Sequence, residues 1–168
     1  MLFRSVCIDY RDVNLAFPKD NYPTPFIDQI IDDCAGCEIF LFMDGFFSHN
    51  QINIYPDDQH KTTFICPSGM FTYRKLLLGL KNFGANFQRA MDYAFNDIKH
   101  IVQPYLDDLP VHSQKWTDHP IHLRAIFLHY RHYKIHLNLH KCVFCVGSGR
   151  LLGFVVSKEG IQIDPLKV

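Results

Sequence analysis

The stretch after Leu80 limits the possible folds more than any other part of the sequence. Apolar residues recur there at helical spacing, and the stripe runs from Phe83 to Ile98. Short apolar runs of strand length occur before and after it, at 39–43, 101–111 and 143–146. An amphipathic helix must bury its apolar face, so we expect this helix to lie across a sheet built from those runs.

The other segments complete a mixed pattern. A helix is expected at 26–36, where apolar residues recur at helical spacing. A second helix is expected to begin at Thr117 or Asp118, with its apolar face formed by Leu123, Ile126, Phe127 and Tyr130. Further strands are expected at 6–8, 52–54, 62–66, 151–156 and 161–163, with a turn at 56–58 and a hairpin turn at 147–149. The order of strand, helix, hairpin, helix and strand predicts an α+β fold with helices packed on one face of a sheet.

Composition allows one domain and gives little sign of a partner. The 168 residues can bury a single core, and Lys+Arg and Asp+Glu both total 17, so there is no overall basic excess that would indicate nucleic acid. No apolar run is long enough for a membrane span, and the first residues lack the apolar stretch of a secretory signal. We therefore expect an intracellular protein with reduced thiols and no membrane partner.

Aspartates stand where apolar strands end. Asp44 follows the run 39–43, and Asp107 and Asp108 lie near the tip of the expected hairpin 101–111. An Asp-Asp pair is usually a solvated turn, but charges beside apolar strands are costly unless something binds them. Carboxylates that bridge two divalent ions can neutralise charge during phosphoryl transfer, and hard oxygen ligands favour Mg²⁺. On this hypothesis the Cα atoms of Asp44 and Asp107 lie within about 10 Å of each other.

A series of short motifs occurs in a familiar order. These are Asp9-Tyr10-Arg11-Asp12-Val13-Asn14, Asp20-Asn21-Tyr22-Pro23-Thr24-Pro25, Phe42-Met43-Asp44-Gly45, Gly79-Leu80-Lys81-Asn82, Phe87-Gln88, Tyr105-Leu106-Asp107-Asp108 and Leu152-Gly153-Phe154. Over nearly its whole length the chain resembles the reverse transcriptase of gypsy-type long-terminal-repeat retrotransposons. One motif alone would be weak support, but an ordered series at matching spacing is specific.

The resemblance implies a fold and a division of the chain. The fold would be a polymerase palm, a ferredoxin-like βαββαβ sheet with helices on one face, together with part of the fingers. Residues 1–36 and 50–78 would belong to the fingers, and 37–49 and 79–150 to the palm. Residues 151–168 would form the primer-grip hairpin and the start of the next segment.

The resemblance also implies an activity, cofactors and partners. The activity would be that of an RNA-directed DNA polymerase, which transfers nucleotides to a primer 3′-hydroxyl with two metal ions. Asp44 and Asp107 would bind the metals with support from Asp108. The cofactor would be two Mg²⁺ ions, with Mn²⁺ able to substitute. The partners would be an RNA or DNA template with its primer, and deoxynucleoside triphosphates.

Further roles are implied at positions that match the family's motifs. Arg11, His49 and Gln88 would lie at the nucleotide, although a surface salt bridge would also explain Arg11 and a solvated helix face would explain Gln88. Leu152, Gly153 and Phe154 would grip the primer end, where glycine lets a backbone approach closely. Lys141 would be a candidate general acid for the departing pyrophosphate.

The sequence also departs from the family pattern. His49 replaces an aromatic residue that blocks a ribose 2′-hydroxyl, and Phe47, Leu77, Leu78, Phe83 and Asn86 replace other residues of the pattern. Ser5 stands where a triphosphate-binding arginine is expected. The family's thumb, connection, ribonuclease H and integrase parts have no counterpart in these residues. We therefore expect a truncated, degenerate copy whose isolated chain does not extend a primer.

Two other hypotheses stay open from the residues alone. Cys34-Ala35-Gly36-Cys37 and Cys142-Val143-Phe144-Cys145 are C-x-x-C pairs, and His136 and His140 precede the second, so a zinc module is conceivable. A catalytically dead relic that only binds nucleic acid is the other. Metal content and primer extension would separate these hypotheses from a working polymerase.

Overall fold

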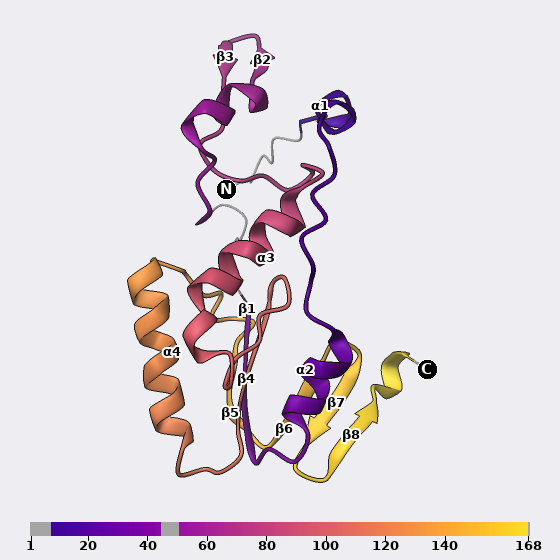
Figure 1. Cartoon of the computed structure of the whole chain (residues 1–168), viewed down its shortest axis with the longest axis vertical. Helices are drawn as coiled ribbons and strands as arrows, with labels where there is room; N and C mark the ends of the chain where they lie inside the picture. The colour runs from indigo at the N-terminus through magenta and orange to yellow at the C-terminus, as the bar shows by residue number, and fades with distance from the viewer. Residues whose placement is uncertain (1–7, 45–50, 168) are drawn as a thin grey trace.

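A central sheet of three strands organises the molecule (Figure 1). The computed structural model describes residues 8–44 and 51–167. The sheet has the order β4-β1-β5, with β1 at Ile39–Asp44, β4 at Asp108–Ser113 and β5 at Val143–Val146. Both neighbours run antiparallel to β1, and in the β1–β4 pair Ile39 lies opposite Ser113 and Asp44 opposite Asp108.

Both faces of β1 are buried, which explains why its sequence is apolar without alternation. On one face, Leu41 and Met43 pack with α3 (Phe83–Ala94) and α4 (His119–Tyr133), through residues that include Phe87, Met91, Ile126 and Tyr130. On the other face, Phe40 packs with α2 (Ile27–Cys34) and with the sheet β6-β7-β8. Each large apolar side chain buried in this way contributes about 1.5–3 kcal/mol.

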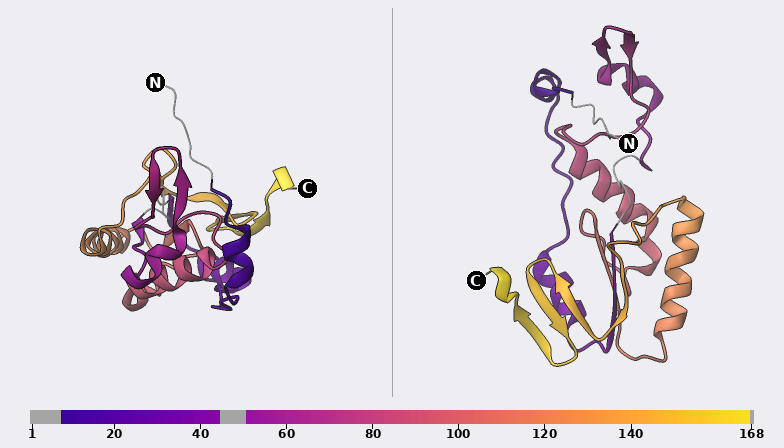
Figure 2. Two further views of the ribbon diagram at one scale, coloured as in Figure 1. Left: turned by 90° about the horizontal axis from the view of Figure 1, so that it is seen from above. Right: turned by 180° about the vertical axis from the view of Figure 1, so that it is seen from behind.

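The apolar stripe of α3 meets the sheet as the sequence predicts. Figure 1 shows α3 running obliquely across the central strands, and Phe87, Met91, Ala94 and Phe95 are all buried in the shared core. The two views of Figure 2 place α4 and the β6-β7-β8 sheet on opposite sides of the central strands. The two longer helices therefore share the expected face, while α2 and the second sheet cover the other.

The connections around the central sheet follow the predicted ferredoxin-like order. The chain passes from β1 through α3 and the short 3-10 helix η3 (Asn96–Ile98) to a hairpin, then through β4 and α4 to β5. The first arm of the hairpin makes only single bridges, Val102 with Val111 and Tyr105 with Asp108. The expected hairpin at 101–111 is thus present with sparse pairing.

The C-terminal strands differ from the prediction. The run 151–156 is not one strand, because a turn at Leu152 and Gly153 separates β6 (Ser148–Leu151) from β7 (Phe154–Ser157). The expected hairpin turn at 147–149 is also wrong, since β5 and β6 belong to different sheets. The turn before β8 (Gly160–Ile163) is where the sequence predicts it, and η4 (Pro165–Lys167) follows.

The remaining elements project from one end of the body formed by the central sheet and the helices that cover it (Figure 1). They are α1 (Arg11–Ala16), the 3-10 helix η2 (Pro56–Thr62), and the hairpin of β2 (Phe64–Cys66) and β3 (Gly69–Phe71). The strand expected at 52–54 is reduced to one bridge between Asn53 and Lys75, and η2 replaces the simple turn expected at 56–58. The strand expected at 6–8 lies almost wholly outside the described residues. No helix in the described part of the chain is long and apolar enough to cross a membrane.

Two histidines near the far end of β4, His112 partly buried and His119 almost fully buried, predict that acid destabilises the fold. Burial lowers the pKa of His112, opposed by Asp33 and reinforced by His122 and His100. Burial, and then His122, lowers the pKa of His119, whose side chain is almost fully buried. Below the unfolded histidine pKa of about 6.5 the unfolded chain binds more protons than the folded chain, so stability falls as pH falls.

We expect the free energy of unfolding to drop between pH 7 and pH 5 by up to about 1.4 kcal/mol per pH unit for each histidine. Urea unfolding across this range measures the slope. The raised pKa of Asp108 increases stability as pH falls, which opposes the effect of the histidines. The wild-type chain is therefore compared with His112→Gln, in which the unfolding free energy should change less with pH. An unchanged slope in that variant would contradict the assignment to His112.

Candidate active site

The aspartates expected at strand ends come together at one end of the β1–β4 pair. Asp44 is the last residue of β1, and it lies directly opposite Asp108, the first residue of β4. Opposed residues of an antiparallel pair have Cα atoms about 4.5–5.5 Å apart, and chain neighbours about 3.8 Å. The Cα atoms of Asp44 and Asp107 are therefore within about 10 Å, and the expected proximity is confirmed.

Negative charge accumulates at this strand end. Asp107 and Asp108 are exposed, whereas the side chain of Asp44 is only 24% exposed. The pKa of Asp108 is raised, first by desolvation and then by the charges of Asp44 and Asp107, while Lys141 acts to lower it. Three carboxylates held together at a water-facing strand end supply the hard oxygen donors that divalent cations prefer.

Lys141 supplies a cation to this cluster. Its Nζ atom lies 3.3 Å from Oδ2 of Asp44, across 97 residues of sequence. The backbone N–H of Asn138 donates to the carbonyl oxygen of Asp44 at 2.9 Å, which ties the segment before β5 to the end of β1. The ammonium therefore stands where the carboxylate charge would attract a metal ion. Within residues 8–44 and 51–167, no three His, Cys, Asp or Glu side chains are arranged to hold an ion without rearrangement.

Gln88 lies beneath the turn that carries Asp107. Its side chain is fully buried, and its Nε2 donates to the carbonyl of Pro104 at 2.8 Å. Its Oε1 accepts the backbone N–H of Leu106 at 2.9 Å. Both ends of the amide are therefore used inside the protein, and the expected contact of Gln88 with a nucleotide stays a prediction. Gln88 holds the backbone next to Asp107.

Arg11 lies far out on the surface in a local ion pair. Its Nη2 atom is 2.5 Å from Oδ2 of Asp9, and its side chain is 87% exposed. This is the surface salt bridge that the sequence left as the alternative for Arg11. The pair lowers the pKa of Asp9, through the side-chain hydrogen bond first. His49, expected beside the nucleotide sugar, lies outside the described residues, as do Ser5 and Phe47.

The expected primer grip is a tight turn beside the carboxylates. Leu152 and Gly153 have φ angles of 51° and 92°, which matches the two-residue hairpin turn that needs positive φ at both positions. The N–H of Asp164 donates to the carbonyl of Gly153 at 3.0 Å. A cavity of about 60 Å³ is lined by both Asp108 and Leu152, so one residue of the turn and one of the carboxylates border the same space.

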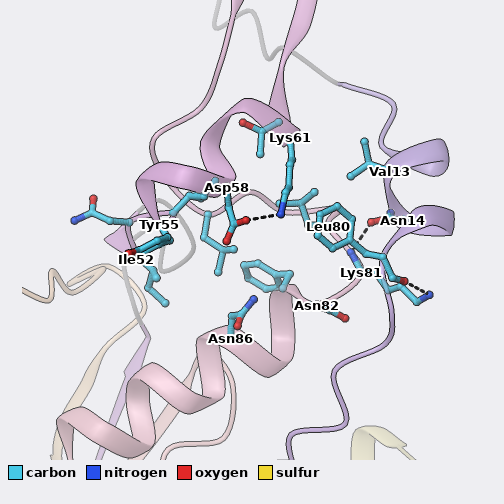
Figure 3. Close-up of a pocket in the computed structure, with 16 residues that line it drawn as sticks. Val13, Asn14, Ile52, Tyr55, Asp58, Lys61, Leu80, Lys81, Asn82 and Asn86 are labelled. Atoms are coloured by element: carbon cyan, nitrogen blue, oxygen red, sulfur yellow. Dashed lines mark hydrogen bonds and ion pairs between the residues drawn. The ribbon is translucent and has the colours of Figure 1, made fainter.

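A larger cavity was not anticipated from the sequence. It has a volume of about 360 Å³ and lies between α1, the segment 52–62 and the start of α3 (Figure 3). The Asn14 side chain donates to the carbonyl of Gly79 at 2.8 Å and accepts the N–H of Lys81 at 2.7 Å. Asn14, Gly79 and Lys81 all belong to quoted motifs, so the motifs marked these positions even though no role had been given to them.

The cysteine pairs give no support to a zinc module. Cys34 and Cys37 are buried, and desolvation raises the pKa of Cys34 to about 12, which disfavours the thiolate that zinc requires. Cys145 is exposed on β5, and Cys142 approaches the carbonyl of Asp44 instead of a common ligand site. His136 and His140 are exposed.

The fold and the strand-end carboxylates agree with the class of protein that the family comparison shows. Residues 2–156 match the family described as reverse transcriptase (RNA-dependent DNA polymerase), and the chain belongs to that family. It is 33% identical to the retrovirus-related Pol polyprotein from transposon 297 of Drosophila melanogaster and 31% identical to that from transposon gypsy of the same organism. These alignments cover 97% and 98% of the chain but 16% of each relative. The Tf2-3 polyprotein of Schizosaccharomyces pombe is 28% identical over 91% of the chain and 12% of the relative.

Solved structures show the same fold. The foamy viral protease-reverse transcriptase in complex with an RNA/DNA hybrid has a TM-score of 0.82 at 20% sequence identity, covering 94% of this chain and 21% of that one. A second structure of that protein, in complex with double-stranded DNA, has a TM-score of 0.84 at 20% identity, with coverage of 94% and 28%. The chain is therefore a reverse transcriptase domain that spans a small part of its relatives' length.

Proposed function

We propose that this domain performs nucleotidyl transfer as the palm, with part of the fingers, of an RNA-directed DNA polymerase. The observation that carries the proposal is the placement of Asp44 opposite Asp108, with Asp107 beside them, at the water-facing end of the β1–β4 pair. The proposed division keeps 37–49 and 79–150 as palm, 1–36 and 50–78 as fingers, and 151–168 as the primer grip with the start of the next segment.

The residues of the strand end would act on a primer and a deoxynucleoside triphosphate. Asp44 and Asp107 would hold two Mg²⁺ or Mn²⁺ ions, with Asp108 adding negative charge beside them. Such ions lower the cost of charge on the attacking and leaving oxygens of an in-line displacement. The primer 3′-oxygen would form a bond to the α-phosphorus of the triphosphate. At the same time, the bond between the α-phosphorus and the pyrophosphate oxygen would break. Lys141, 3.3 Å from Asp44, is close enough to the carboxylates to be a proton donor to the pyrophosphate.

The turn of Leu152, Gly153 and Phe154 would position the primer end. It borders the same small cavity as Asp108, so a strand held by this turn would lie next to the carboxylates. Template and primer are the proposed partners, and a foamy viral relative of this fold has been solved with an RNA/DNA hybrid. In relatives much longer than this chain, other segments would clamp the duplex.

The test is primer extension by a chimaera. Residues 1–168 replace the matching segment of the transposon 297 polyprotein, and extension of oligo-dT on poly-rA is measured with Mg²⁺ or Mn²⁺. We expect the chimaera to extend the primer and its Asp107→Asn version to lose about 10³-fold in rate or more, because charge stabilisation and positioning supply most of the catalysis.

The isolated chain should stay at the background of its own Asp107→Asn variant, because we propose that clamping the duplex requires further segments of the longer relatives. A folded chimaera that also stays at background would overturn the proposed polymerase and favour a relic that binds nucleic acid without catalysis. Extension by the isolated chain would show that the duplex can be held by these residues alone.

A further inference from the structure

A line of hydrogen bonds leads from Tyr22 to the backbone beside Asp107. The Tyr22 hydroxyl donates to Oδ2 of Asp92 at 2.8 Å, and Oδ1 of Asp92 accepts from Nε2 of Gln88 at 3.2 Å. Gln88 in turn accepts the N–H of Leu106 at 2.9 Å. Tyr22 precedes α2, whereas Asp92 and Gln88 belong to α3, so three separate segments are linked.

The last bond of this line holds a strained residue. Leu106 has a φ of 51°, in the left-handed region where a residue with a side chain is disfavoured by about 1–2 kcal/mol. A leucine stays in such a conformation only when its surroundings hold it there. Gln88 does so from both sides, since it also donates to the carbonyl of Pro104 at 2.8 Å. Asp107 is the next residue, so its direction depends on this turn.

Asp92 and the carbonyl of Pro104 both select which end of the Gln88 amide meets Leu106, since both accept from its NH₂ group. A carboxylate only accepts hydrogen bonds, so it requires the NH₂ group of Gln88 on its own side. The Oε1 atom is then left facing the N–H of Leu106, which needs an acceptor. An amide turned the other way would set Oε1 against the Asp92 carboxylate and the NH₂ group against the N–H of Leu106.

Tyr22 fixes Asp92 from the other side. Its ring lies under the Arg89 guanidinium, 4.6 Å from the ring centroid, and Arg89 also pairs with Asp20 at 2.8 Å. The pKa of Tyr22 is raised, first by its hydrogen bond to Asp92, so the hydroxyl remains a donor at neutral pH. The 20–25 motif, which had no assigned role, thus holds the outer end of the line.

We propose that Asp92, held by Tyr22, is a positioning residue that sets the Asp107 turn through the orientation of the Gln88 amide. The effect of this positioning on catalysis rests on the proposed function. The link from Asp92 to the Leu106 backbone can be tested without it.

Amide hydrogen exchange of Leu106, measured by NMR on the whole chain, tests the link. Asp92→Ala keeps a good helix former in α3 while removing the acceptor, and we expect Leu106 to exchange about five- to tenfold faster. Tyr22→Phe should give a smaller increase, because only the outer bond is lost. Asp92→Asn can still present an oxygen to Gln88 and should restore most of the protection.

Asp97→Ala is the matched control. Asp97 follows α3 and pairs with His129 instead of the line described here. Leu106 exchange that is unchanged in Asp92→Ala, or that rises equally in Asp97→Ala, would overturn the proposal, since the second result would reflect a general loss of stability.

Mn²⁺ binding to the same variants separates this inference from the proposed function. If the wild-type chain binds Mn²⁺ and Asp92→Ala binds it several-fold more weakly than Asp97→Ala, the positioning of Asp107 is supported. Equal binding by both variants would overturn the positioning of Asp107 by Asp92. A wild-type chain that binds no Mn²⁺ would count against the proposed function, while Leu106 exchange would still decide the link.

Discussion

Neutralising Asp44 and Asp108 together should weaken Mn²⁺ binding by about 100-fold, whereas Lys141→Gln should strengthen it about three- to tenfold. Two unit charges a few ångströms from a divalent ion contribute several kcal/mol even with strong solvent screening, and about 1.4 kcal/mol corresponds to tenfold. Lys141 carries the opposite charge and lies 3.3 Å from an Asp44 oxygen, so its removal should act in the opposite direction.

Calorimetry of the isolated chain at low ionic strength measures both effects without requiring catalysis. The double variant is Asp44→Asn with Asp108→Asn, and the matched control is Asp97→Asn, which neutralises an exposed aspartate outside this cluster. Weaker Mn²⁺ binding in the Asp44/Asp108 variant, together with stronger Mn²⁺ binding in Lys141→Gln, would locate the ion at the strand end. An equal loss in Asp97→Asn, or weaker binding in Lys141→Gln, would contradict that location.

Gly149→Ala should destabilise the fold by about 1–3 kcal/mol, the usual cost of overpacking a core. A Cβ atom at Gly149 would lie 2.1 Å from Cε2 of Phe42, far inside van der Waals contact. The Phe42 ring cannot move away freely, because it stacks on Phe40 with ring centroids 5.8 Å apart and planes at 11°. Phe40 itself is fully buried between the central sheet and α2.

Urea unfolding of four variants tests this contact: Gly149→Ala, Gly147→Ala, Phe42→Leu, and Phe42→Leu combined with Gly149→Ala. Gly147→Ala is the control, because a Cβ there would come no closer than 3.9 Å to the carbonyl oxygen of Glu38, and its cost should stay below about 1 kcal/mol. In a Phe42→Leu background, Gly149→Ala should cost much less than in the wild type, since the clashing ring is gone. A cost that is equal in both backgrounds would place the strain somewhere other than Phe42.

The sequence alone predicted the features that depend on local patterns. The stripe from Phe83 to Ile98 gave the helix that crosses the sheet, and the run 39–43 gave the central strand with Asp44 at its end. Helical and strand periodicities are set by backbone geometry, so apolar residues at those spacings identify buried faces directly. The order of elements and the placement of Asp107 and Asp108 near a hairpin tip then brought the carboxylates together.

Tertiary structure decided what local patterns leave open. The run 151–156 looks like one strand, yet Leu152 takes a φ of 51° because β6 and β7 both pair in one small sheet and must turn there. Gln88 could have faced solvent on α3, but Pro104 and Leu106 arrive from 16 and 18 residues further on and bind its amide. Such contacts join segments distant in sequence, so helical or strand spacing carries no record of them. That is why the sequence by itself determined the crossing helix, the central strand and the carboxylates of the site, whereas only the folded chain decided how the Asp107 turn is held.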